Sequence, residues 1–343
     1  MLDHLLLAYI PQIQAQRNPN LLDNMDFFTL RLIVLYLLLA FALCVLLVHL
    51  RGRVRLRFDR QLVDHSAIFA PYNLLMYAFS AVPARPILDR RGFPQLDLLQ
   101  ANWRVIRDEA MHLFDEGYIR AAAKNDDASF NSFFKQGWKR FYLKWYGEPL
   151  ASAETLCPNT VALLKSIPSV KAAMFALLPP GAKLNPHRDP FAGSLRYHLG
   201  LITPNSPACR IFVDGHEHAW GDGKDVVFDE TYVHWAENGT DETRVILFAD
   251  VERPLRTRWM NAINHRVGVF MGSITASPNS DTDTEKTGFI NRLFAFSKRK
   301  GDSSNSFKSR FKSRHKKIYK GLKYAGILVM IWLIFLAPWP IFR

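Results

Sequence analysis

Two long hydrophobic runs lie near opposite ends of the 343-residue chain. Residues 32–48 form an uninterrupted run of 17 apolar residues, and a second apolar run, 324–337, continues into Pro338, Trp339 and Pro340. Because a helix needs roughly 20 residues to cross the hydrocarbon core of a membrane, the first run and its flanks predict a transmembrane helix over 29–50. The second run is shorter. It predicts, over 324–342, either another span or an interfacial helix lying in one leaflet.

Between these runs the pattern of hydrophobic and polar positions changes once. Residues 94–170 show mostly helical spacing, with Trp103, Ile106, Ala110 and Leu113 recurring on one face. From Lys171 onward, short alternating runs are separated by Pro and Gly. These runs predict strands in a small antiparallel barrel or jelly roll; they span residues 174–178, 194–203, 209–214, 225–230 and 243–252.

The net charge of +13 is concentrated beside the two hydrophobic runs. Residues 298–323 carry +10 and residues 51–60 carry +4, which leaves a net charge of −1 for all other residues. Both basic flanks lie on the inner side of their hydrophobic runs. The positive-inside rule therefore predicts that residues 51–323 face the cytoplasm. We interpret the charge as topogenic and as suited to an anionic lipid surface, rather than as a nucleic-acid interface, because no nucleic-acid-binding motif accompanies it.

These patterns predict six segments along the chain. The first, 1–28, is a short segment expected in the periplasm. It is followed by the membrane helix 29–50, a basic juxtamembrane connector 51–93, a folded cytoplasmic domain 94–270, a basic flexible linker 271–323 and the second hydrophobic helix 324–342. Three scattered cysteines indicate no disulfide framework.

Two clusters of distinctive side chains have ordinary structural explanations. The aromatic residues between Phe133 and Tyr146 are interpreted as core packing, with ligand stacking as the alternative. His216 and His218 flank Glu217 in a sequence that resembles a metal site, but we interpret it as a turn connecting two strands.

A His-x-Asp unit lies within the predicted strands. In extended backbone His187 and Asp189 point to the same side, and His234 follows 47 positions after His187. Two imidazoles and one carboxylate are the ligand set of mononuclear non-haem Fe(II) oxygenases. The chain has 11 histidines, so the alternative is that this triplet occurs by chance and its histidines are ordinary surface or core residues.

An arginine strengthens the case for a pocket. Arg244 lies within the very apolar run TRVILFADVE, where a guanidinium is costly unless it is paired, and its fork suits a carboxylate. A dicarboxylate such as 2-oxoglutarate fits this requirement. Arg196 and His198 alternate with Leu195, Tyr197 and Leu199 and are expected to line the same pocket, with an exposed strand face as the alternative.

The segments PPGAKLNPHRDPFAGSLRYHLGL and FDETYVHWAENGTDETRVILFADVERP resemble the core of the aspartyl/asparaginyl β-hydroxylase family of Fe(II)/2-oxoglutarate dioxygenases. The resemblance extends over about residues 94–256. Within the family, the chain is most similar to the bacterial lipid A 2-hydroxylases, which are integral inner-membrane proteins with hydrophobic segments at both ends. This resemblance implies an α+β fold: a double-stranded β-helix (jelly-roll, cupin-like) catalytic core with an N-terminal helical layer, flanked by transmembrane helices.

The resemblance also implies roles for individual residues. His187, Asp189 and His234 would bind Fe(II), Arg244 would anchor the distal carboxylate of 2-oxoglutarate, and Arg196 with His198 would contact the same co-substrate, with O2 as the oxidant. The vertebrate peptidyl hydroxylases of the family lack a carboxylate at the position of Asp189. Ala176 stands where they use a serine toward the co-substrate.

The expected function is hydroxylation of a secondary acyl chain of lipid A, or of a related acylated lipid, at C2. The expected location is the cytoplasmic face of a bacterial inner membrane, with two hydrophobic segments in that membrane. One alternative is a peptidyl aspartate/asparagine β-hydroxylase. The other is a catalytically inactive, membrane-tethered binding protein.

Overall fold

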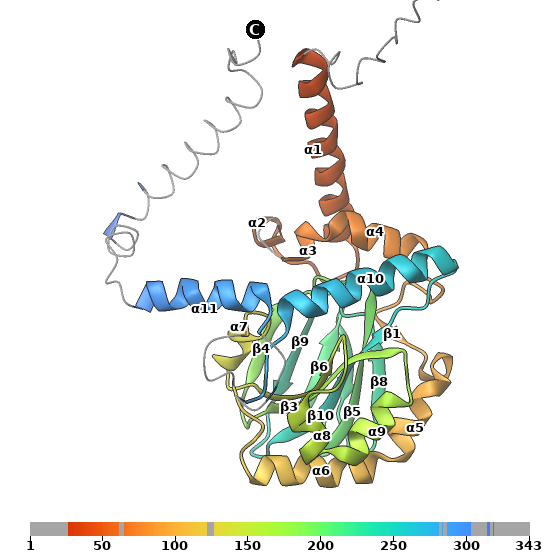
Figure 1. Cartoon of the computed structure of the whole chain (residues 1–343), viewed down its shortest axis with the longest axis vertical. Coiled ribbons are helices and arrows are strands. Elements are labelled where there is room, and N and C mark those ends of the chain that lie inside the picture. The colour runs from red at the N-terminus through yellow and green to blue at the C-terminus, as the bar shows by residue number, and fades with distance from the viewer. Residues whose placement is uncertain are drawn as a thin grey trace, which may run out of the picture. The chain divides into compact units, whose positions relative to one another are not determined.

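A computed structural model describes residues 27–61, 65–121, 127–280, 283, 287–302, 314–315 and 318. The chain divides into two units, one formed by residues 43–307 and the other by residues 1–42 with 308–343. The fold that carries the site belongs to the first of these units (Figure 1).

The N-terminal hydrophobic run is one continuous helix, α1 (Phe27–Leu50). Its segment Thr29–Leu50 is long and apolar enough to cross a membrane, by length and composition. Within the 43–307 unit, the last turns of α1 pack Val45 and Val48 against Ala67 and Ala70 of the helices that follow. The predicted second hydrophobic helix, 324–342, lies outside the described residues.

Short helices form a layer outside the sheets. In the longest of these helices, α6, residues Ile106, Ala110 and Leu113 are buried at helical spacing, as the sequence predicted. The helices of this layer are α2 (Phe58–Gln61), α3 (His65–Ile68), α4 (Ala70–Ala78), η1 (Arg90–Gly92), η2 (Pro94–Leu96), α5 (Asp97–Ala101), α6 (Trp103–Asp115), α7 (Asn131–Phe134), α8 (Ala151–Leu156) and α9 (Pro158–Lys165).

Two antiparallel sheets form the centre of the unit. The larger has the order β1 (Ile87–Leu88), β8 (Asp225–Phe228), β5 (Ser194–Ile202), β10 (Arg244–Glu252), β3 (Val170–Leu178) and β2 (Lys139–Trp145). The smaller has the order β4 (Lys183–His187), β9 (His234–Asn238), β6 (Cys209–Val213) and β7 (His216–Ala219). From β3 to β10 the chain passes back and forth between the sheets. This alternation is the jelly-roll arrangement that the sequence predicted.

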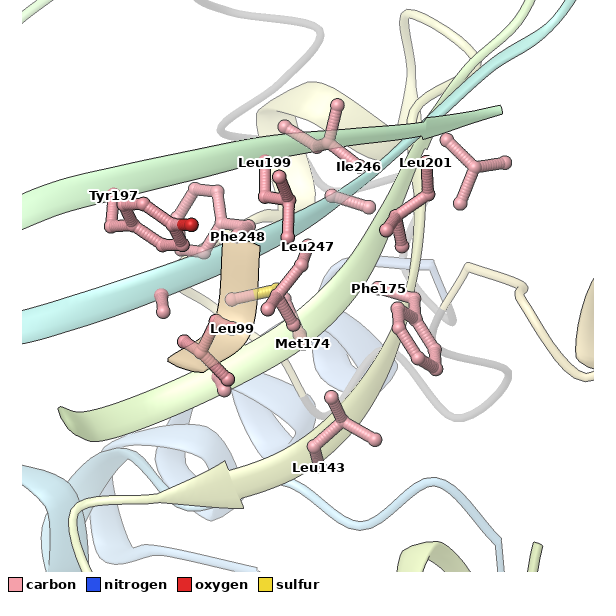
Figure 2. Close-up of a cluster of buried hydrophobic side chains, with 14 of the residues drawn as sticks. Leu99, Leu143, Met174, Phe175, Tyr197, Leu199, Leu201, Ile246, Leu247 and Phe248 are labelled. Carbon is pink, nitrogen blue, oxygen red and sulfur yellow. The ribbon is translucent and has the colours of Figure 1, made fainter. Parts of the chain in front are cut away.

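One face of the larger sheet packs under the helices, and alternation sends every second side chain there. Leu247 of β10 lies in register with Phe175 of β3 and Leu199 of β5. Figure 2 shows these residues in one cluster with Leu99 of α5 and Leu143 of β2. The intervening positions on β5 and β10 face the other way, toward the smaller sheet, and they include polar groups.

Strands β2, β7 and β9 lie outside the runs that the sequence predicted as strands. Residues 94–170 include strand β2, whose aromatic residues Phe141 and Tyr142 are buried in pairing with β3. The His216–Glu217–His218 sequence is strand β7 rather than a turn. His234, which lies between the predicted runs 225–230 and 243–252, begins strand β9. All three strands are short, or are buried on both faces, and so lack a clear alternating pattern.

The segments on either side of the predicted catalytic domain are also more ordered than expected. Residues 51–93 contribute α2 to α4 and β1 instead of a simple connector, and Met76 of α4 packs against Met260 of α10 (Arg258–Thr275). Part of the expected flexible linker 271–323 is helical, because α10 extends to Thr275 and α11 spans Phe289–Asp302. Figure 1 shows α10 lying beside α4 at one end of the sheets.

Candidate metal and anion site

Three side chains with metal-binding groups come together at one end of the smaller sheet. His187 ends β4, His234 begins β9, and the two residues are partners in the antiparallel pairing of these strands. Asp189 follows two residues after His187. The ligand atoms of the three residues all lie within 4.8 Å of one another. Among the residues that the structure describes, this is the one cluster of histidines, cysteines or acids with such a geometry.

Both imidazoles are oriented by backbone carbonyls. Nδ1 of His187 lies 2.7 Å from the carbonyl oxygen of Asn185, and Nδ1 of His234 lies 3.0 Å from that of Tyr232. When Nδ1 donates in these hydrogen bonds, the lone pair of Nε2 is free to bind a metal. Burial, assisted by the nearby His187, lowers the pKa of His234 to about 3, so its imidazole is neutral at physiological pH.

Asp189 is held ionised. Burial opposes its charge, but Arg196 and the two histidines together keep its pKa below the ordinary value. Its Oδ1 lies 3.8 Å from Nε2 of His187, and its Oδ2 lies 2.9 Å from Nη2 of Arg196. A carboxylate and two imidazoles fit the donor set of a mononuclear Fe(II) site with open positions for substrate and oxygen.

Arg244 is a buried cation without a counter-ion in the described structure. The residue is 2% exposed, and its Nε and Nη2 atoms have no hydrogen-bond partner among the described residues. Its guanidinium lies over the ring of Trp220, with 4.4 Å between Cζ and the ring centroid. Burial lowers the pKa of Arg244 to about 10. Since an unpaired buried charge is costly, this side chain is suited to an anionic ligand.

His198 shares that environment. Both of its ring nitrogens are buried without a hydrogen-bond partner in the described residues, and the ring packs near Phe228 and Phe248. Burial, followed by the positive charges of Arg196 and Arg244, lowers the pKa of His198 well below its usual range. The neutral ring therefore offers one donor and one acceptor beside Arg244.

Arg196 is surrounded very differently. It forms ion pairs with Asp189 at 2.9 Å and with Asp250 at 2.8 Å, and a third ion pair with Glu230. Burial disfavours its charge, but these three carboxylates raise its pKa above the ordinary value. Its expected contact with the co-substrate remains a prediction.

Sequence reasoning missed most of this acidic cluster. Asp250 shares a strand face with Arg244, which was the available signal, but Glu230 and Tyr146 gave none. The hydroxyl of Tyr146 donates to Asp250 at 2.9 Å, and Ser194 donates to Glu230 at 2.7 Å. The acidic cluster therefore holds the side chain of Arg196 in place, and Arg196 in turn holds Asp189.

These residues line one pocket between the two sheets. All six residues singled out from the sequence line it: His187, Asp189, Arg196, His198, His234 and Arg244. Ala176 lies there as well. The rest of the lining is apolar or aromatic, and consists of Phe133, Trp138, Leu184, Ile211, Trp220, Phe228, Trp235, Ala236, Ile246 and Phe248. Two members of the aromatic cluster, Phe133 and Trp138, thus face the pocket, while Phe141 and Tyr142 are core residues.

Known proteins share this part of the chain. Residues 100–254 match the family model described as Aspartyl/Asparaginyl beta-hydroxylase. An ornithine lipid ester-linked acyl 2-hydroxylase from Rhizobium tropici is 38% identical over 152 residues, which cover 43% of this chain and 54% of that protein. Aspartyl/asparaginyl beta-hydroxylase from Mus musculus is 27% identical over 187 residues, which cover 52% of this chain and 25% of that protein. The chain therefore spans about half the length of the first relative and a quarter of the second.

Similarity to solved structures is weaker. A prolyl-4-hydroxylase from Pseudomonas putida aligns over 45% of this chain and 88% of its own, with 22% identity and a TM-score of 0.30. A score this low does not identify the fold, which is defined here by the strand order of the two sheets. Residues 100–254 are thus similar to the aspartyl/asparaginyl β-hydroxylase family, and this stretch includes the motifs around His187 and His234.

Proposed function

We propose that this protein is an Fe(II)- and 2-oxoglutarate-dependent dioxygenase that hydroxylates an acyl chain of a membrane lipid. The observation that carries the proposal is the unpartnered, buried Arg244 in the same pocket as His187, Asp189 and His234. A metal site beside a cation that lacks a counter-ion is what a co-substrate with a chelating 2-oxo acid and a distal carboxylate requires.

The side chains have distinct roles in this proposal. His187, Asp189 and His234 hold iron, which supplies activation of O2 for insertion of oxygen into a C–H bond. The backbone carbonyls of Asn185 and Tyr232 keep both imidazoles in the tautomer that binds metal. Arg244 binds the distal carboxylate of 2-oxoglutarate, and His198 offers a neutral hydrogen-bonding group next to it. The aromatic walls exclude water from the reacting centre.

The pocket favours an acyl chain over a peptide carboxylate as substrate. Arg196 and Arg244 are its two basic lining residues apart from the histidines. Arg196 already has three acidic partners, and Arg244 is committed to the co-substrate. No further Lys or Arg among the described lining residues is left to bind an aspartate side chain. The relative from Rhizobium tropici, whose name states an ester-linked acyl 2-hydroxylase, supports the same choice.

Lipid A is the substrate we favour, with hydroxylation at C2 of a secondary acyl chain, and ornithine lipid is the alternative that the named relative suggests. We place the catalytic domain at the cytoplasmic face of a bacterial inner membrane, anchored by α1 and by the hydrophobic segment 324–342. In this arrangement the lipid head group and the bilayer position the acyl chain, which has no polar group near C2 apart from its ester.

Mass spectrometry of total lipids from cells with and without the gene tests the proposal. We expect one additional oxygen atom on an acyl chain of lipid A only when the gene is present. The same gain on an ornithine lipid would change the proposed substrate but support the same hydroxylation reaction. Unchanged lipids together with hydroxylated Asp or Asn in a protein would support the peptidyl alternative, and no new hydroxyl group anywhere would support the inactive binding protein.

A further inference from the structure

The residues that directly follow the membrane helix pack against the loops that carry the metal-site residues. Arg51, which the sequence suggested as one of several lipid-facing arginines, has a side chain that is only 12% exposed. Its guanidinium lies between the rings of Tyr77 and Tyr232, 3.9 Å from each centroid. The expectation of a uniformly solvent- or lipid-facing basic flank is therefore wrong at Arg51, whereas Arg53 and Arg55 are exposed.

Arg51 contacts both chain segments that carry the metal-binding residues. Its Nη2 donates to Asp229 at 2.7 Å and its Nη1 donates to Thr231 at 2.5 Å, in the loop that leads to His234. Its carbonyl oxygen accepts a hydrogen bond of 2.8 Å from Arg188, the residue between His187 and Asp189. Arg188 in turn donates to the carbonyl oxygen of Thr231 at 2.8 Å. One residue thus links the two loops.

Two neighbouring contacts reinforce the same connection. Gly52 has a positive φ of 89°, and a Cβ atom there would lie 2.7 Å from Oδ1 of Asp214 and 2.9 Å from Tyr232. Asn73 of α4 holds the loop after Asp189, because its side chain donates to the carbonyl oxygen of Pro190 and accepts from the amide of Ala192, both at 2.9 Å. We call Arg51, Gly52 and Asn73 the juxtamembrane brace.

We infer that the juxtamembrane brace is a positioning element for the metal centre. It holds the His187–Asp189 loop and the loop before His234 together, and so fixes both at a set distance from the end of α1. Tyr232, which stacks on Arg51, also provides the carbonyl that orients His234. This inference rests on the proposed function, and it adds that residues directly after α1 support the geometry of the metal-binding loops.

Titration of the purified full-length chain with Co(II), followed by visible absorption, tests the inference without relying on turnover. We expect Arg51→Gln to weaken Co(II) binding at least about tenfold, as loss of an outer-shell contact does in other metal sites, and Arg51→Lys and Asn73→Ala to weaken it less. Two controls are matched. Arg140→Gln breaks a similarly buried ion pair, with Asp127 at 3.1 Å, that touches neither loop, and Arg55→Gln removes an exposed charge of the same flank.

The outcomes separate the inference from the proposed function. A wild-type protein that binds no Co(II) would contradict the metal site itself. If the wild type binds Co(II) but Arg51→Gln binds it equally well, or loses no more affinity than Arg140→Gln, the brace inference is wrong while the proposed function stands. If Arg51→Gln does not fold, Arg51→Lys and Asn73→Ala decide in the same way: weakened binding relative to Arg55→Gln supports the brace, and unchanged binding overturns it.

Discussion

Arg196 and Arg244 line the same pocket on neighbouring strands, β5 and β10, and both are almost fully buried, yet their surroundings differ completely. Arg196 has three carboxylate partners from Asp189, Glu230 and Asp250, which raise its pKa. Arg244 has no acidic partner among the described residues, and burial lowers its pKa. A cation whose counter-ions belong to the fold is a structural element. A buried cation without one costs stability, which is consistent with our proposal that Arg244 binds an anionic co-substrate.

The largest effect should come from removing the proposed metal ligands, for which neither arginine can substitute. We expect His187→Ala and His234→Ala to abolish metal retention and to lower hydroxylation by about 1,000-fold or more, since a metal contributes several kcal/mol to such reactions. Metal analysis of the purified variants and an assay of succinate formation measure both effects. A His234→Ala variant with normal activity would refute the ligand assignment.

Removing Arg196 should chiefly damage the fold. Arg196→Met leaves Asp189, Glu230 and Asp250 buried together without their shared cation, and breaking such a network costs about 3–5 kcal/mol. The free energy of unfolding of the metal-free protein measures this loss. If Arg196→Met is as stable as the wild type, Arg196 does not have the structural role that distinguishes it from Arg244.

Removing Arg244 should leave the fold intact and weaken binding of the co-substrate. Arg244→Met deletes an unpaired buried charge. The free energy of unfolding of the metal-free protein should therefore stay the same or rise, by up to about 3 kcal/mol. Without charge-assisted hydrogen bonds to a carboxylate, the KM for 2-oxoglutarate should rise about 10- to 100-fold. Steady-state kinetics with varied 2-oxoglutarate checks the second effect. A clear loss of stability would show that Arg244 has a structural partner after all.

The smallest effect concerns pH. Burial, with Arg196 and Arg244 nearby, holds the pKa of His198 well below its value in an unfolded chain, about 6.5. As the pH falls below 6.5, the unfolded state takes up a proton that the folded state does not, so stability falls with pH by at most about 1.4 kcal/mol per unit for this histidine. Unfolding of the metal-free protein between pH 5 and 7 (~1 unit on either side of that value) should therefore be less pH-dependent in His198→Gln. An identical pH dependence would mean that His198 is protonated in the fold.

Local sequence pattern is sufficient to predict the elements that alternate regularly. Strand β5 alternates around Arg196 and His198, which favoured a pocket face for both residues, whereas Arg244 was noticed as a charge in the apolar β10. The His-x-Asp spacing suggested His187, Asp189 and His234, the family resemblance implied that they share a metal, and the fold brings the three groups together. These predictions depend on period-two alternation and on ligand chemistry, and both can be recognised within a few consecutive residues.

What could not be predicted depends on partners far away in the chain. Arg51 and Asp229 are 178 positions apart, so the arginine looks like one more charge beside a membrane helix. Glu230 acquires its role only because the fold places it against Arg196. Strands β4, β7 and β9 have short polar sequences, and pairing within the smaller sheet, rather than local propensity, makes them strands.

Anaerobic titration of the iron-loaded protein with 2-oxoglutarate tests the central claim most directly, because a 2-oxo acid that chelates Fe(II) gives a visible charge-transfer absorption. We expect this absorption in the wild type, at higher 2-oxoglutarate concentrations in Arg244→Met, and not at all in His234→Ala. A wild-type protein that holds Fe(II) but develops no such absorption, or an Arg244→Met variant that saturates at the wild-type concentration, would contradict the account.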